Sequence, residues 1–303
     1  MSDASTIDNK IKSGPAVADF VELLKPITWF PPMWALMCGL VSAGATPWTH
    51  SWAFIAGLLL TGPLVCGASQ IVNDWFDREV DAINEPNRPI PSGRVPGSQA
   101  LWFAVIWTVI AQLWSLSLGS WVAGATAIAL VLAWMYSAPP FRLKQNGWWG
   151  NLSVGITYEG LAWVTGAAIA LGGTMPPGPV LIVALLYSLG AHGIMTLNDF
   201  KSVEGDRQMG VKSLPAQLGT DRAAKLACVV MALPQLVVIA LLIQWQLTIA
   251  ALVVGLVVAA QGTAMVKLLA DPEARAPWYN ATGVSLYVSG MMVSAIALGG
   301  HLV

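Results

Sequence analysis

Long apolar stretches dominate the chain, and short polar segments separate them. A helix needs about 20 apolar residues to cross the roughly 30 Å hydrocarbon core of a membrane, and nine stretches approach or reach that length. The pattern therefore predicts an all-α integral membrane protein with nine transmembrane helices. The predicted spans are 27–45, 51–72, 99–118, 121–138, 151–171, 179–197, 223–243, 246–268 and 278–299.

The composition agrees with this pattern and excludes an ordinary soluble fold. Of the 303 residues, 56% are hydrophobic and 10% are charged, whereas about 25% charged residues are usual in soluble domains. The first 24 residues are polar and lack the apolar core of a cleavable signal peptide. We therefore expect a polar cytoplasmic N-terminal tail at 1–24 and a single polytopic domain at 25–303.

The placement of the charges predicts the orientation in the membrane. All fifteen Lys and Arg residues fall in or beside alternate connections between the predicted spans, which the positive-inside rule assigns to the cytoplasm. The N-terminus is then cytoplasmic, and the C-terminus with His301 lies outside. Fifteen of the sixteen Asp and Glu residues share the cytoplasmic side, and only Glu159 falls inside a predicted span. We therefore expect the chemistry at the cytoplasmic face.

An acidic motif, NDWFDREVD at 73–81, follows the second span. In a continuous helix each residue advances by about 100°, so Asp74, Asp77 and Asp81 project within about 60° of one another. Like charges at this spacing repel, and the cluster therefore requires a compensating cation. Hard oxygen ligands at few positions suit Mg2+, which commonly bridges to a substrate phosphate.

A second acidic motif, NDFKSVEGD at 198–206, ends the sixth span and repeats the Asn-Asp start and the later Asp of the first. Ser202 stands in the place of Asp77, and a basic loop with proline follows each motif. Two facing clusters could hold metal ions on opposite sides of a diphosphate, while basic side chains contact its remaining oxygens. The alternative interpretation is that both motifs are solvated helix ends with ordinary surface charge.

These strings resemble the UbiA superfamily of intramembrane prenyltransferases, and within it the chlorophyll and bacteriochlorophyll synthases, over nearly the whole chain. The superfamily pattern NDxxDxxxD is intact at 73–81, although Ser202 replaces the Asp that is usual in the second motif. Cys66 and the Ser-Gly-Arg run at 92–94 are most similar to bacteriochlorophyll a synthases. Strings similar to this branch are DAINEPNRPIPSGR at 81–94, YSAPP at 136–140, LKQNGW at 143–148 and NDFKSVEGDR at 198–207.

The resemblance implies an enzyme that esterifies the propionate of bacteriochlorophyllide a with geranylgeranyl or phytyl diphosphate and releases diphosphate, at the last stage of bacteriochlorophyll biosynthesis. Its implied cofactor is Mg2+. The acceptor arrives ionised because carboxylic acids titrate near pH 4, so no general base is required. The implied location is the inner membrane of a photosynthetic bacterium, with membrane lipid and proteins of pigment biosynthesis as partners and no nucleic acid.

Carried over to this sequence, the family's functional residues fall in the two motifs and in the basic loops. Arg88, Lys144 and Lys212 are the implied diphosphate-binding residues. The implied catalytic residues are Asp74, Asp77, Asp81, Asp199 and Asp206, and the implied metal-binding residues are these five and Asn73.

Three residues are candidates for binding the acceptor, each with an alternative interpretation. His192 lies seven residues before Asp199, hence on nearly the same helix face and roughly 10 Å deeper; it is a ligand of the macrocycle's magnesium or a hydrogen-bonded core histidine. Glu159, inside a span, contacts the acceptor or is a structural partner. Tyr136 stacks on the macrocycle, as the Trp pair at 148–149 does, or these residues belong to an interfacial aromatic belt.

Two other functions remain open from the residues. A chlorophyll a synthase, or another UbiA-type prenyltransferase, would share the metal chemistry and differ in its acceptor. A secondary transporter would belong to a different class, and its substrate site is expected near the membrane midplane. The acidic motifs lie at one predicted face instead, which favours the prenyltransferase.

Overall fold

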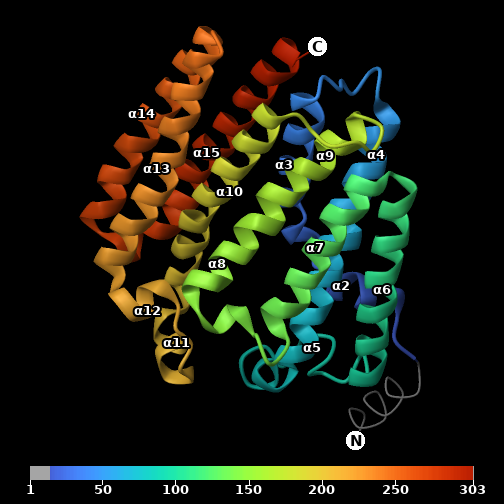
Figure 1. The fold of residues 1–303 in the computed structure, drawn as a ribbon. Coiled ribbons are helices and arrows are strands. Elements are labelled where there is room, and N and C mark those ends of the chain that lie inside the picture. The colour runs from blue at the N-terminus through green and yellow to red at the C-terminus, as the bar shows by residue number, and fades with distance from the viewer. Residues whose placement is uncertain (1–13, 303) are drawn as a thin grey trace, which may run out of the picture.

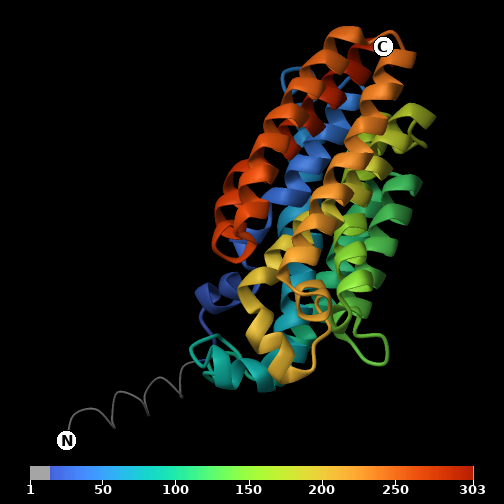
Figure 2. The ribbon, with the colours of Figure 1, turned by 90° about the vertical axis from the view of Figure 1, so that its left-hand side faces the viewer.

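The computed structural model describes residues 14–302, and across that range the chain forms helices and no β-strand. Long helices lie side by side in a bundle (Figure 1). The first helix, α2 (Val17–Leu23), belongs to the predicted N-terminal tail, of which residues 1–13 lie outside the described residues. Both views place α2 at the end of the bundle that lies opposite the C-terminus (Figures 1 and 2).

The first half of the chain after α2 forms five α-helices and three short helical segments. The α-helices are α3 (Phe30–Ser42), α4 (Ser51–Leu59), α5 (Gly67–Asn84), α6 (Gly97–Ser117) and α7 (Ser120–Ser137). The short segments are the 3-10 helix η1 (Pro26–Thr28), the π-helical η2 (Leu60–Cys66) between α4 and α5, and the 3-10 helix η3 (Leu143–Gln145).

The second half begins with a helical run interrupted by a π-helical segment, and it ends with the three long helices α13 to α15. Its α-helices are α8 (Gly147–Gly155), α9 (Ala162–Ala170), α10 (Gly178–Asn198), α11 (Val203–Met209), α12 (Leu214–Leu218), α13 (Thr220–Gln244), α14 (Thr248–Ala270) and α15 (Pro272–Leu302). The π-helical η4 (Ile156–Leu161) joins α8 to α9, and the 3-10 helix η5 (Asp199–Ser202) joins α10 to α11.

Seven helices among the described residues are long and apolar enough to cross a membrane, which confirms the predicted all-α membrane architecture. Two predicted spans fall on other helices: 27–45 covers the shorter apolar α3, and 151–171 covers the end of α8, η4 and α9. The seven helices are Ser51–Asn84, Gly97–Ser117, Ser120–Ser137, Gly178–Met209, Thr220–Gln244, Thr248–Ala270 and Pro272–His301.

The π-helical η2 contains Pro63, which has no N–H group to donate within the helix. The indole Nε1 of Trp107 on α6 donates a hydrogen bond of 2.7 Å to the Pro63 carbonyl oxygen. Helices in a membrane tolerate such breaks when neighbouring side chains satisfy the freed backbone groups. The contact gives a carbonyl oxygen of this π-helical segment a partner on a neighbouring helix.

Small residues bring α3 and α9 into close contact. A Cβ atom on Gly39 would lie 2.0 Å from the backbone oxygen of Trp163, and one on Gly166 would lie 2.1 Å from that of Leu36. Close approach of backbones at small residues is a general means of packing helices in membranes. The two glycines thus fix the crossing of these helices, and α3 also lines the central cavity of the bundle.

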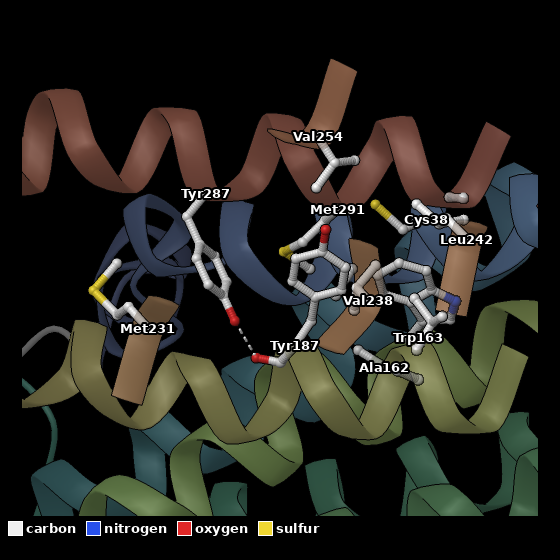
Figure 3. Close-up of a cluster of buried hydrophobic side chains, with 14 of the residues drawn as sticks. Cys38, Ala162, Trp163, Tyr187, Met231, Val238, Leu242, Val254, Tyr287 and Met291 are labelled. Atoms are coloured by element: carbon white, nitrogen blue, oxygen red, sulfur yellow. Dashed lines mark hydrogen bonds between the residues drawn. The ribbon is translucent and has the colours of Figure 1, made fainter. Parts of the chain in front are cut away.

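The core next to this crossing contains a group of buried aromatic side chains (Figure 3). The rings of Trp163 and Tyr187 stack with centroids 5.8 Å apart. The hydroxyl of Tyr287 on α15 donates a 2.6 Å hydrogen bond to the Tyr187 backbone oxygen, and the Tyr187 hydroxyl lies 3.0 Å from Ser294 Oγ. Because the hydroxyls of Tyr187 and Tyr287 both have partners, these contacts connect α10 and α15 while keeping the two buried groups paired.

Candidate active site

A central cavity of about 580 Å³ lies between the two halves of the bundle. Asn73 on α5 and Asn198 on α10, the first residues of the two acidic motifs, both line it. Much of its remaining wall is apolar, with Trp34 from α3 and Val288 and Met291 from α15. The cavity therefore joins a polar end, where the motifs meet, to a long apolar interior.

The first motif lies on the last turns of α5, as the sequence predicted. Asp74 and Asp81 are buried, and Asp77 is half-buried. Each carboxylate contacts a basic side chain: Lys25 Nζ lies 2.5 Å from Asp74, Arg88 Nη1 2.7 Å from Asp81, and Lys144 Nζ 2.6 Å from Asp77. Three ammonium or guanidinium groups thus offset the repulsion that the helix would otherwise carry.

Lys25 and Arg142 also belong to this cluster, although neither lies in an acidic motif. Arg142 Nη2 lies 3.7 Å from Asp77. Both residues have left-handed backbones, with φ of 45° at Lys25 and 42° at Arg142, a conformation uncommon outside glycine. The signal available in the sequence was weak: each is a basic residue beside a predicted span on the predicted cytoplasmic side.

The second motif repeats the spacing of the first but has a different backbone. The α-helix ends at Asn198, the 3-10 segment η5 follows, and α11 begins at Val203. Asp199 accepts a 3.2 Å hydrogen bond from Asn151 Nδ2 on α8, and Asp206 accepts one of 3.1 Å from Ser202 Oγ. Ser202, which replaces an acidic residue of the superfamily pattern, thus orients Asp206.

Both motifs approach one aromatic side chain. Tyr136 on α7 lines the central cavity and lies within electrostatic reach of Asp77, Asp199 and Asp206. The amide groups that start the motifs are held from other helices: Asn73 Nδ2 donates to Ser137 Oγ at 3.2 Å, and Asn198 Oδ1 accepts from Asn280 Nδ2 on α15 at 2.9 Å. These contacts bring the two motifs together at the same end of the cavity.

The donor groups at this end are of the kind that Mg2+ takes, namely carboxylate and amide oxygens with room for water and phosphate oxygens. Among residues 14–302, however, the His, Cys, Asp and Glu side chains form no group of three that is already arranged around a metal. In the first motif, basic side chains contact the carboxylates. A metal bound there must take carboxylate oxygens from those partners.

The three predicted diphosphate-binding residues lie in different surroundings. Arg88 contacts Asp81 and also approaches Asp74 at 3.6 Å. Burial lowers the pKa of Lys144, and the charge of Asp77 opposes that change. Lys212 has an exposed side chain, and its backbone pairs with that of Asn146 just before α8. Arg88 and Lys144 therefore belong to the acidic cluster, and Lys212 holds two loops together through its backbone.

The candidate acceptor-binding residues lie in two separate parts of the bundle. Tyr136 and Glu159 line the central cavity, and Glu159 lies in the π-helical η4 beside Tyr158. The Tyr158 hydroxyl accepts hydrogen bonds from Cys66 Sγ at 3.3 Å and from Gln70 Nε2 at 3.1 Å. His192 is buried, with its ring 5.8 Å from that of Trp148, and it does not line the central cavity.

Comparison with known proteins identifies the family. Residues 30–289 match the model of the UbiA prenyltransferase family, and the chain therefore belongs to that family and is a prenyltransferase. It is 53% identical to the bacteriochlorophyll synthase 33 kDa chain of Cereibacter sphaeroides, over 95% of each chain. It is 50% identical to the protein of the same description from Rhodobacter capsulatus, over 96% of this chain and 97% of that one. These relatives confirm the resemblance predicted from the motifs.

More distant relatives and solved structures agree in fold. The chloroplastic chlorophyll synthase of Avena sativa is 37% identical over 91% of this chain and 75% of its own. A UbiA homologue from Archaeoglobus fulgidus, solved with GPP and Mg2+, superposes with a TM-score of 0.70 at 18% identity and covers 93% of this chain and 99% of its own. A homologue from Aeropyrum pernix gives 0.65 at 19% identity, with 91% and 98% covered.

Proposed function

We propose that this enzyme transfers a geranylgeranyl or phytyl group from its diphosphate to the propionate of bacteriochlorophyllide a, the reaction of a bacteriochlorophyll synthase. The observation that carries the proposal is the near full-length identity of about 50% to proteins described as bacteriochlorophyll synthases. The central cavity supports it, because two acidic motifs stand at one end of an apolar interior that suits a prenyl chain.

In the proposed reaction the allylic C–O bond of the donor breaks, and its electron pair leaves with diphosphate. A propionate oxygen of the acceptor then forms the new C–O bond, which gives a prenyl ester and inorganic diphosphate. The acceptor is already ionised at neutral pH, so the step transfers no proton. Mg2+ held by the carboxylates of the two motifs would supply positive charge beside the leaving diphosphate, where such stabilisation is most effective.

We assign the metal to Asn73, Asp74, Asp77 and Asp81 on α5, and to Asp199 and Asp206 in the second motif. Arg88 and Lys144 then leave the carboxylates that they contact and bind phosphate oxygens. Lys25 has the same kind of position beside Asp74, and we add it to the diphosphate-binding residues. Support for the metal comes from the Archaeoglobus fulgidus homologue, which was solved with GPP and Mg2+.

The acceptor lies beside the prenyl chain in the central cavity, near Tyr136 and Glu159. Apolar walls from α3 and α15 keep water from the allylic cation, which water would otherwise capture as an alcohol. Carboxylates at one end of the cavity, rather than at mid-depth, argue against a secondary transporter.

For the membrane topology we propose nine spans, with α3 and the run at 147–170 added to the seven long helices. The N-terminus and the active site are then cytoplasmic, in the inner membrane of a photosynthetic bacterium, and the chain is one polytopic domain preceded by a polar tail. The basic residues support this arrangement because they fall at alternate connections.

The test is to incubate the purified enzyme with Mg2+, one prenyl diphosphate and either bacteriochlorophyllide a or chlorophyllide a. Chromatography then measures the esterified pigment, with and without EDTA. We expect an EDTA-sensitive ester from bacteriochlorophyllide a. Ester formation with chlorophyllide a alone would support the second candidate, a chlorophyll a synthase, the activity named in the description of the Avena sativa relative. Absence of ester with both pigments from folded enzyme would disprove both.

A further inference from the structure

Glu159 stands apart from the other residues in the wall of the central cavity. Among the described residues that line the cavity, it alone has an acidic or basic side chain, and it is half-buried there in the π-helical η4. Its carboxyl group makes no hydrogen bond and no ion pair with any residue of 14–302. Acidic residues within membrane spans ordinarily pair with another group and mark functional sites. The partner of Glu159 is therefore expected on a molecule that enters the cavity.

The hydroxyl groups nearest to Glu159 are engaged elsewhere. The Tyr158 hydroxyl accepts two hydrogen bonds from the run of η2 and α5. Tyr287, which lies within electrostatic reach of Glu159, donates to the backbone oxygen of Tyr187 (Figure 3). A lone carboxylate is costly to bury among apolar groups. The carboxyl group is therefore most stable in its neutral form, which has an O–H group to donate.

The position of Glu159 along its helical run places it deep in the cavity. Asn151, on the same run, bonds to Asp199 of the second motif and so marks the polar end. Glu159 follows eight residues later, which is roughly 12 Å further along at the α-helical rise. In the proposed reaction the allylic carbon and the propionate meet at the polar end. Glu159 therefore faces a part of the acceptor that is distant from the reacting propionate.

We propose that Glu159 selects the acceptor by donating a hydrogen bond to the acetyl group of bacteriochlorophyllide a. Chlorophyllide a has a vinyl group at that position, which accepts no such bond. The acetyl group and the propionate lie on different pyrrole rings, and their separation is comparable to the distance from Asn151 to Glu159. The ring ketone, which both pigments carry, lies nearer to the propionate. The inference rests on the proposed function, which supplies the identity of the acceptor.

The selection follows from the cost of an unpaired polar group. With the acetyl acceptor, the carboxyl O–H has a partner inside the apolar part of the cavity. With the vinyl acceptor, the same group stays buried without one, and a buried donor without a partner carries its full desolvation penalty. Sites that are built to hydrogen-bond a substrate group discriminate strongly against analogues that lack the group. Glu159 is thus a specificity-determining residue that touches the acceptor and takes no part in the bond changes.

The test compares bacteriochlorophyllide a with its vinyl analogue, which differs only at this substituent. The measured quantity is kcat/KM for ester formation by the full chain with each acceptor. We expect wild type to prefer the acetyl acceptor by about tenfold or more. Glu159→Leu loses the preference through a lower kcat/KM for the acetyl acceptor, whereas Glu159→Gln retains it because an amide N–H donates in place of the O–H.

Ser285→Ala is the matched control. The Ser285 hydroxyl also belongs to the wall of the central cavity, but it donates a hydrogen bond to the Ala281 backbone oxygen of its own helix. The preference should be unchanged in this variant. A readout independent of turnover is the resonance Raman spectrum of the bound acceptor. We expect the acetyl C=O stretch at a lower frequency in wild type and Glu159→Gln than in Glu159→Leu.

Three outcomes would overturn the inference. An equal loss with both acceptors in Glu159→Leu would place the bond on a group that they share, such as the ring ketone. A loss in Glu159→Gln as large as in Glu159→Leu would mean that the charge acts and not a donated bond. An acetyl frequency that is the same in wild type and Glu159→Leu would exclude the contact. Enzyme that esterifies neither acceptor contradicts the proposed function, whereas enzyme that esterifies both equally contradicts only this inference.

Discussion

Asp77 is the middle carboxylate of the first motif, and two basic side chains, Lys144 and Arg142, approach it. We predict that Asp77→Asn lowers kcat by about 10²–10³-fold, because it removes an ionised ligand where the leaving-group charge is stabilised. The folding of the variant should be retained, since the amide keeps the shape of the side chain. Rates of ester formation and elution in detergent test this, with the exposed Asp221→Asn as the matched control. Wild-type turnover in Asp77→Asn would contradict the metal site.

Lys25 allows a second test at a single residue. It is distant from the first motif in the sequence, and the fold places it beside Asp74. In Lys25→Gln we expect KM for the prenyl diphosphate to rise by about tenfold, the cost of about 1.4 kcal/mol for a lost charge-assisted contact. The smaller change in kcat separates this role from that of Asp77. Initial rates over a range of donor concentrations provide the measurement. Lys267→Gln, in the last turn of α14, is the control. An unchanged KM would remove Lys25 from the site.

The sequence predicted the carboxylates of the site but not the side chains that hold them. Asp74 and Asp77 stand out because unpaired like charges at helical spacing demand a cation. Lys25 is 49 residues from Asp74, and Asn151 is 48 residues from Asp199. Nothing local in the sequence indicates such pairings, because they depend on how separate helices pack.

At the scale of elements, the two acidic motifs show how equal spacing can give unequal structure. The first stays within α5, so its three carboxylates share a helix face as predicted. The second passes from α10 through a 3-10 segment into α11, and Ser202 bonds to Asp206. Sequence periodicity carries no information on this break, because short 3-10 segments are common at helix ends. The π-helical segments at η2 and η4 were equally unpredictable.

The close crossing of α3 and α9 leads to a prediction about how substitutions of glycine affect stability. We expect Gly166→Ala to destabilise the protein by about 1–3 kcal/mol, the usual cost of overpacking, because its new Cβ would lie 2.1 Å from Leu36 O. Gly124→Ala on α7 meets no atom within 4 Å and should be neutral or slightly stabilising, as alanine is the better helix former. Thermal unfolding in detergent compares the two variants. Equal midpoints would contradict the assigned packing of these helices.

At the scale of the whole molecule, the polar features of the site gather at one end of the bundle. The C-terminal end of α5, the short helices α11 and α12 and the turn between α7 and α8 lie together there, away from the C-terminus (Figure 1). The sequence predicted this asymmetry from its basic residues alone, because positive charge marks the side of the membrane that retains it. The central cavity, in contrast, is built from six separate stretches of chain and could be found only in the structure.

The proposed orientation predicts which loops reach each side of the membrane. Thr49 lies in the exposed loop between α3 and α4, and Gln145 is exposed in the segment before α8, at the end of the bundle that carries the motifs. A membrane-impermeant maleimide should label Thr49→Cys in right-side-out vesicles and Gln145→Cys only in inverted ones. The native cysteines give little background because Cys38, Cys66 and Cys228 are all buried. Labelling of both positions from the same side would contradict the topology, whereas the reverse pattern would keep the bundle and place the active site outside the cytoplasm.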